Sequence, residues 1–155
     1  MFESLEMSAV AQWVGLSLWA YPLLLSAHIV GLAIVVGIFS MRDLRLLGLF
    51  PGLRADSFLT LGKLGWVGFI INAVSGILLF TSQAVTFISS TPFLIKISCI
   101  VAGMVMAGII QARLRGELAS GDGDMQLRKS TKLIALASLT LWVAAIIAGR
   151  LIAYL

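Results

Sequence analysis

The chain has 155 residues, of which 60% are hydrophobic and 12% charged, so it is not an ordinary soluble domain, which carries about 25% charged residues. We expect one integral membrane domain over residues 1–155, and the single cysteine, Cys99, excludes an intrachain disulfide and any CxxC redox or zinc motif. The net charge of +4 does not indicate nucleic-acid binding, because the basic residues lie between apolar stretches, where membrane topology explains them.

The N-terminal segment, residues 3–17 (ESLEMSAVAQWVGLS), predicts a short amphipathic helix in the membrane interface. Trp13 and Trp19 would lie at headgroup level, where tryptophan is enriched. The segment carries Glu3 and Glu6 but no basic residue, so we do not expect a cleavable signal peptide, which begins with a basic region.

Four apolar stretches are long enough to cross a hydrocarbon core of about 30 Å. They cover approximately residues 21–41, 64–83, 93–112 and 131–154. Each should be a helix, because a spanning segment in lipid must satisfy its own backbone hydrogen bonds. The sequence therefore predicts an all-α fold, an integral membrane four-helix bundle.

Basic residues are concentrated in two of the connections between these spans. The first-to-second connection holds Arg42, Arg45, Arg54 and Lys63, and the third-to-fourth holds Arg113, Arg115, Arg128, Lys129 and Lys132. The second-to-third connection has no charge. The positive-inside rule then makes both basic connections cytoplasmic and both termini periplasmic, in a multi-pass protein of the bacterial inner membrane.

Three polar residues within the spans are the candidate site. His28, the only histidine, should lie about 10 Å below the periplasmic surface, and Lys96 and Arg150 each about 6 Å below it, at the helical rise per residue. No acidic residue falls within the predicted spans, so the two cations would need an external anion. Haem propionates fit this need, with His28 as the iron ligand. Gly31, one turn from His28, would let a flat ring lie close.

A structural interpretation of the same residues remains open. Lys96 and Arg150 could extend to lipid phosphates, and His28 could be a hydrogen-bonded contact between helices, with Asn72, Ser75 or a carbonyl as partner. The chain would then be a structural or accessory subunit of a larger membrane complex.

A copper-handling role is a third hypothesis. Cys99, Met104 and Met106 offer soft ligands for Cu(I), but Met104 and Met106 are two residues apart and should face different sides of a helix. Trp142 could form a wall of a cofactor pocket, although core packing is the usual role of such a residue.

Glycines recur at helical spacing in the second span. Gly62, Gly65 and Gly68 predict close packing against a neighbouring helix, as small residues commonly do in membranes.

Three stretches, SAHIVGLAIVVGIFSMRDLRLLG, FLIKISCIVAGMVMAGIIQARLR and LWVAAIIAGRLIAY, resemble a bacterial four-helix membrane family of unknown function. That family is similar to the membrane domain of copper-resistance protein D and to the haem-binding, four-helix protoporphyrinogen oxidase of bacteria. In the oxidase group a first-span histidine, linked to haem b, and a third-span lysine are required. His28 and Lys96 match these positions.

The chain also departs from the oxidase group. It has Val35 and Val36 in the region where an aromatic residue often follows the histidine, and it has no second histidine. The resemblance therefore implies the haem site and not the oxidase activity. We expect a small haem-b protein of the lipid bilayer, with His28 binding the metal, that transfers electrons or supports an oxidation. A homodimer could share one haem between two copies of His28.

Overall fold

The computed structural model describes residues 2–119 and 129–154, and every regular element within these ranges is a helix. The helices are α1 (Phe2–Glu6), α2 (Ala9–Leu16), α3 (Ala20–Leu47), α4 (Ser57–Thr81), α5 (Ala84–Ser89), α6 (Thr91–Ala119) and α7 (Lys129–Leu151). Arg128 and the side chain of Lys129, both assigned above to a cytoplasmic loop, lie outside what the structure describes.

Four of these helices, α3, α4, α6 and α7, are long and apolar enough to cross a membrane. The predictions of an all-α fold and of four helices long and apolar enough to cross a membrane are confirmed. Helices α3, α4 and α6 extend beyond the predicted spans at their charged ends. Hydropathy detects the apolar part of a helix and not its continuation through basic residues. For the same reason six residues assigned to connections lie in helices and not in loops: Arg42, Arg45, Lys63, Arg113, Arg115 and Lys132.

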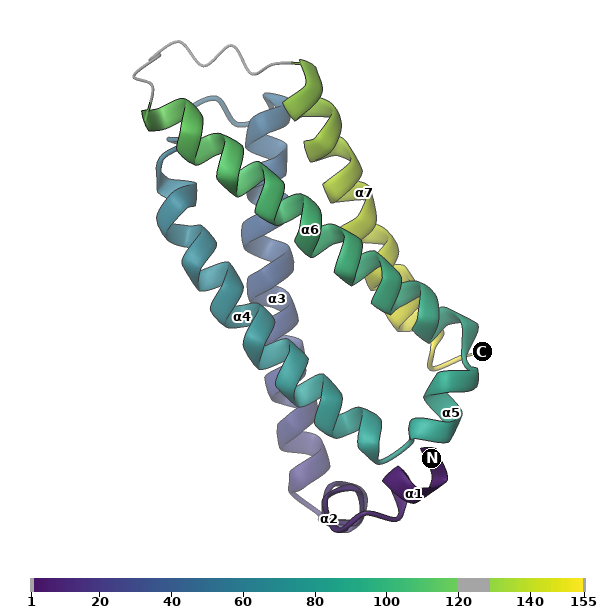
Figure 1. Cartoon of the computed structure of the whole chain (residues 1–155). Coiled ribbons are helices and arrows are strands. Elements are labelled where there is room, and N and C mark those ends of the chain that lie inside the picture. Colours follow the sequence, from purple (N-terminus) through teal and green to yellow (C-terminus); the bar gives the residue numbers. More distant parts are fainter. Residues whose placement is uncertain (1, 120–128, 155) are drawn as a thin grey trace.

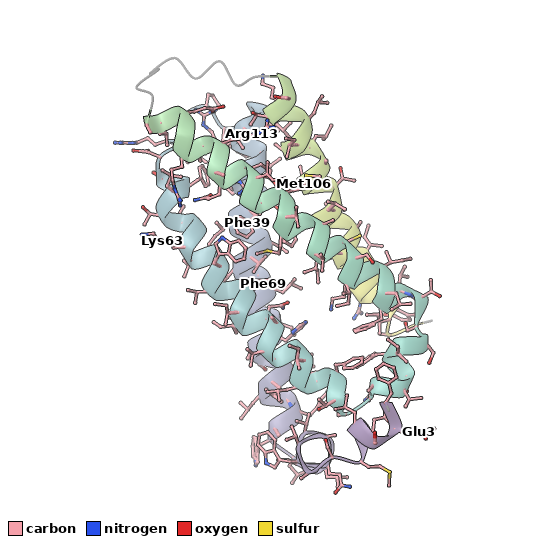
Figure 2. All side chains as sticks on the ribbon, in the orientation of Figure 1. Glu3, Phe39, Lys63, Phe69, Met106 and Arg113 are labelled. Atoms are coloured by element: carbon pink, nitrogen blue, oxygen red, sulfur yellow. The ribbon has the colours of Figure 1, made fainter. Side chains whose placement is uncertain are left out.

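The long helices pack as two pairs, α3 with α4 and α6 with α7, and α7 also packs against α3 (Figure 1). Both termini lie at one end of the bundle, together with α1, α2 and α5; we call this the terminal end. The opposite end carries Arg45, Arg54, Arg113 and Arg115, and we call it the basic end. Figure 2 shows Arg113 toward the basic end and Glu3 at the terminal end.

Helices α4 and α6 approach each other at the basic end and diverge toward the terminal end (Figure 1). At the basic end the Gln111 side chain on α6 donates to the backbone oxygens of Phe58 and Leu59 on α4, both at 3.3 Å. Gly62 permits this contact, since a Cβ there would come within 2.6 Å of Gln111 Nε2.

Glycines also bring α4 close to α3. A Cβ on Gly68 would lie 2.6 Å from Cγ2 of Ile34, and a Cβ on Gly65 would lie 2.8 Å from Cζ of Phe39. Real Cβ atoms do not come this close to other atoms, so these positions admit no side chain without a shift of the neighbour. The predicted role of the glycine series in helix packing is confirmed.

Gly31 on α3 marks the tightest backbone approach in this interface. A Cβ there would lie 2.7 Å from the backbone nitrogen of Asn72 and 2.8 Å from the backbone oxygen of Gly68. We expect Gly31→Ala to lower stability by about 1–3 kcal/mol, because the backbones must separate to accept the methyl group. Unfolding in detergent, followed by circular dichroism, measures this loss.

Gly37, six residues along the same helix, is the matched control. Apart from its own stretch of helix, no described atom lies within 4 Å of a Cβ built there. Gly37→Ala should leave stability unchanged or raise it by up to about 1 kcal/mol through helix propensity. Equal effects of the two substitutions would mean that helix propensity, and not the crossing, determines the result.

The core lies in the middle of the bundle, where three long helices meet. Its largest buried cluster consists of Val35, Phe39, Met104, Ala107 and Trp142, and a second consists of Leu46, Ile110 and Ala135. The Phe39 and Trp142 rings stack with centroids 6.0 Å apart, and Trp142 is only 1% exposed. Trp142 is therefore a core residue, as its sequence position suggested.

The terminal end differs from the prediction. Residues 3–17 form two helices and not one, because the Ser8 hydroxyl accepts a hydrogen bond from Ala11 N at 3.2 Å and starts a new helix there. Glu6 Oε1 accepts from Val85 N at 2.8 Å, which attaches the N-terminal segment to α5. Trp13 and Trp19 are exposed, and their place at headgroup level stays a prediction.

An aromatic cluster joins the helices of the terminal end. The rings of Phe80, Phe87 and Phe93 stack with centroids 5.3–6.3 Å apart, and Phe2 contacts Phe80 edge-on at 6.4 Å. The cluster connects α1, α4, α5 and α6 and so fixes the start of α6, which carries Lys96.

Candidate functional site

His28 lies on α3, is partly buried, and faces α4. Its Nδ1 is 2.9 Å from the backbone oxygen of Asn72 and 3.3 Å from Oγ of Ser75. A carbonyl oxygen can only accept, so we assign the proton of the neutral imidazole to Nδ1 and the free lone pair to Nε2. No described residue makes a hydrogen bond to Nε2. The ring therefore keeps one nitrogen available for a ligand.

The same residues also bind the two helices together. Asn72 Nδ2 donates to the backbone oxygen of His28 at 2.8 Å, so His28 and Asn72 each supply one side chain and one carbonyl. The predicted contact of His28 with Asn72 and Ser75 is confirmed. Gly76, which the sequence analysis did not single out, makes room for the ring, since a Cβ there would lie 2.9 Å from His28 Cε1.

Lys96 approaches His28 from the other helix pair. Its side chain runs along Gly149 of α7, where a Cβ would lie 3.3 Å from Cδ and 3.6 Å from Nζ. Its ammonium is near enough to act electrostatically on the His28 ring. Within the described ranges Lys96 has no ion pair and no hydrogen-bond acceptor. The structure thus brings together two of the predicted site residues, a histidine and an unpaired cation.

Arg150 and Gly31 lie differently from the expectation. Arg150, in the last turn of α7, is exposed; its Nη2 donates to the Tyr154 hydroxyl at 3.1 Å, and its guanidinium lies 5.4 Å from the centre of that ring. No direct contact between Arg150 and His28 or Lys96 appears among the described residues. The space beside Gly31 is filled by the α4 backbone, so no flat ring can lie against it.

A second polar site, which the sequence analysis missed, lies within α3 toward the basic end. Arg42 is 1% exposed and Asp43 is 0% exposed. Arg42 Nε and Nη2 both donate to Oδ1 of Asp43, at 3.0 and 2.8 Å, and Nη1 donates to the backbone oxygen of Ala107 on α6 at 3.1 Å. The guanidinium carbon also lies 5.0 Å from the centre of the Phe39 ring.

This pair corrects two expectations. Arg42 is not a loop cation, and an acidic residue does lie within a helix that can span the membrane. The predicted span ended at Met41, before the Arg-Asp pair, because charges end an apolar stretch. The helical spacing of Phe39, Asp43 and Leu46 was the available signal, since it places Asp43 on the face with two core residues.

The other ion pair among the described residues is exposed, between Arg54 and Asp56 in the connection from α3 to α4. A hydrogen bond from Arg54 holds the pKa of the Asp56 carboxyl below its usual value, and the same bond raises the pKa of Arg54. Exposed pairs add little to stability, because water screens them. This ion pair is not part of a candidate functional site.

The other candidate ligand sets are not assembled by the described part of the chain. No group of three histidine, cysteine or acidic side chains comes together in those ranges. Met104 is buried in the core, and Met106 does not belong to that cluster. An open hollow at the terminal end includes Glu6, Tyr21 and Gln83 in its lining, but neither His28 nor Lys96.

Comparison with models of known protein families, with curated proteins and with solved structures gives no match. The resemblance to the copper-resistance and oxidase groups therefore stays a prediction.

Proposed function

We propose that the chain is a small membrane protein that binds haem b and serves in electron transfer or another membrane redox reaction. The orientation of His28 carries this proposal. Histidines that bind metals commonly donate their second ring N–H to a carbonyl or carboxylate, which fixes the tautomer and the ring direction. The bond from Nδ1 to Asn72 O has this form and leaves Nε2 for iron.

The other residues present fit part of what haem requires. Lys96 supplies a cation that no described side chain neutralises, and a propionate would neutralise it. Haem held there would supply one-electron chemistry at its iron. With one histidine per chain, His28 would be the only imidazole that a monomer offers to the iron; a weaker group of the same chain, or His28 of a second copy, could also hold it.

The distribution of charge supports an orientation. Arg45, Arg54, Arg113 and Arg115 share the basic end, and the positive-inside rule favours the cytoplasm for such an end. In that orientation His28 and Lys96 would lie nearer the periplasmic face of a bacterial inner membrane, where a redox partner in the periplasm could reach the site.

The reciprocal bonds between His28 and Asn72 favour a second candidate function. Two such bonds connect α3 to α4 without any ligand, as polar side chains do in many membrane bundles. In this case the chain is a structural subunit of a larger membrane complex, and Lys96 contacts a lipid phosphate.

An absorption spectrum of the protein purified in detergent, oxidised in air and then reduced with dithionite, separates the two functions. Haem b binding gives a Soret band and sharp α and β bands on reduction. A flat visible spectrum, with full protein recovery and no uptake of added haemin, favours the structural subunit.

The two cations should differ in their effect on haem retention. Lys96→Met removes the unpaired charge, and loss of a hydrogen bond to a charged group, about 1.5–3 kcal/mol, corresponds to roughly a ten- to hundredfold weaker haem affinity. Arg150→Met is the matched control, because Arg150 is exposed and bonded to Tyr154. Titration with haemin measures both. Equal, wild-type affinity in both variants would contradict a propionate contact of Lys96.

A further inference from the structure

The open hollow at the terminal end has the size and the lining of a binding site for a polar molecule. Its volume is about 610 Å³, within the range of small-molecule sites, about 300–1,000 Å³. Five of its lining residues are polar: Glu6, Gln12, Tyr21, Ser82 and Gln83. They come from α1, α2, α3 and the connection after α4, so the fold brings them together and not the local chain.

Glu6 is the only charged residue in this lining. Its Oε1 accepts from Val85 N at 2.8 Å, which holds the carboxylate in place, and no donor of the described chain meets Oε2. Residues 2–19 and 82–90, which form this part of the terminal end, include no lysine or arginine. The hollow therefore favours a ligand that brings its own positive charge.

The neutral side chains of the lining supply donors beside this carboxylate. Within the described ranges the Tyr21 hydroxyl and the Gln83 amide make no hydrogen bond, and the Gln12 amide makes only a long one, 3.4 Å to Met7 O. A phenol and two amides can donate to an anionic group. The lining thus suits a molecule that carries an ammonium group close to an anion.

The position of the hollow indicates where such a molecule comes from. Helix α2 packs against both α3 and α4 at the terminal end (Figure 1), and these two helices are long and apolar enough to cross a membrane. A bilayer around them has its headgroups at the level of the hollow. Leu16 lines the hollow and is 82% exposed, so it offers an apolar contact to an acyl chain.

We propose that the hollow binds the headgroup of phosphatidylethanolamine. The ammonium donates to the Glu6 carboxylate, and the phosphate accepts from the Tyr21 hydroxyl and from the amides of Gln12 and Gln83; bonds between such groups are strong because charge assists them. This inference does not depend on haem binding.

Other ligands of the membrane surface fit less well. The quaternary ammonium of choline has no N–H to donate and is usually held by several aromatic rings, whereas Tyr21 is the only aromatic residue in the lining. An anionic headgroup meets Glu6 and no cation there. A calcium ion takes about six to eight oxygen ligands, and no group of three histidine, cysteine or acidic side chains forms in the described chain.

Native mass spectrometry of the detergent-purified protein, titrated with phosphatidylethanolamine and with phosphatidylcholine of the same acyl chains, tests the proposal. We expect phosphatidylethanolamine to bind roughly tenfold more tightly, the effect of one hydrogen bond to a charged group. Glu6→Gln keeps an oxygen for Val85 N and should abolish this preference. Glu3→Gln, which removes the same charge from an exposed residue of α1 outside the lining, should retain it.

Two results of this titration would show the proposal to be wrong. Equal binding of the two lipids to the wild type would mean that the hollow does not recognise the ammonium. Equal loss of preference in Glu6→Gln and Glu3→Gln would mean that the net charge of the terminal end, and not the hollow, attracts the lipid.

Filling the hollow gives a measurement that does not depend on charge. A Cβ on Gly15 would lie 3.8 Å from Cβ of Ser82, an ordinary contact. Gly15→Ala should therefore bind phosphatidylethanolamine as the wild type does, and Gly15→Leu, whose side chain starts beside Ser82 in the lining, should bind it several-fold more weakly. Wild-type binding in Gly15→Leu would show that the lipid lies elsewhere.

Glycerophosphoethanolamine, which has the same headgroup without acyl chains, distinguishes a membrane lipid from a soluble amine. It should bind at least tenfold more weakly than the phospholipid, because it cannot make the apolar contact with Leu16. Equal affinity of the two compounds would identify the ligand as a soluble molecule and contradict the assignment to a lipid.

Discussion

Replacement of His28 by asparagine should remove bound haem while the bundle stays folded. An asparagine amide can still donate to the backbone oxygen of Asn72, where His28 Nδ1 now lies at 2.9 Å. It has no imidazole nitrogen to bind iron. The reduced spectrum should lose its α and β bands at unchanged protein yield and helix content.

His28→Ala is the companion variant. It removes both the ligand nitrogen and the bond to α4, so it should lose haem and also about 1 kcal/mol of stability, the net contribution of an ordinary hydrogen bond. Comparison of the two variants separates binding of iron from contact between helices. The haemin-binding titration and the unfolding curve are measured on the same preparations.

Ser75→Ala is the control for the surroundings of the ring. It removes the weaker contact at 3.3 Å and leaves the bond to Asn72 O in place, so haem should be retained. Wild-type haem content in His28→Asn and His28→Ala would show that His28 is not the ligand. The structural interpretation would hold if the wild type and all three variants are free of haem and only His28→Ala is less stable.

The course of the chain was largely predictable, because long apolar segments in lipid have few alternatives to helices. The short helices were not predictable from hydropathy. The capping bond between Ser8 and Ala11 divides α1 from α2. Helix α5 is held by the hydrogen bond from Val85 N to Glu6, which is distant in the sequence. Contacts at such separation are not visible in hydropathy.

The candidate site was predictable in part. Their depth along the predicted spans indicated that His28 and Lys96 lie in the same half of the bundle. The fold brings them within electrostatic reach of each other. Depth does not give the direction of a side chain around its helix. Gly31 therefore proved to contact α4 and not an open face, and Arg150 proved to bind Tyr154.

The buried pair in α3 was missed for a different reason. Adjacent opposite charges look like a solvated helix end in sequence, since most such residues are exposed. Here the helix continues to Leu47. Arg42 donates to the backbone oxygen of Ala107 on α6, and Ser138 on α7 lies beside the Asp43 carboxyl. The spacing of Asp43 from Phe39 and Leu46 indicates a shared helix face, and the packing of three helices shows that this face and Arg42 are inside.

This burial predicts that Asp43→Leu will lower stability by about 3–5 kcal/mol, the usual effect of removing one partner from a buried ion pair. Arg42 would then keep a single described acceptor, the oxygen of Ala107, for its charged guanidinium. Unfolding in mixed detergent, followed by helix content, measures the loss. The spectrum of added haemin serves as an independent check that the terminal end is intact.

The double variant Arg42→Met/Asp43→Leu decides what the pair contributes. Apolar replacement of both partners of a buried pair is often neutral or stabilising, so the double variant should recover most of the stability that Asp43→Leu loses, with a large coupling energy in the cycle. Failure to recover would mean that the stability depends on more than neutralisation of Arg42. The bond from Nη1 to Ala107 O would then be the main connection between α3 and α6 at this level, because no apolar side chain can replace a donor to that carbonyl.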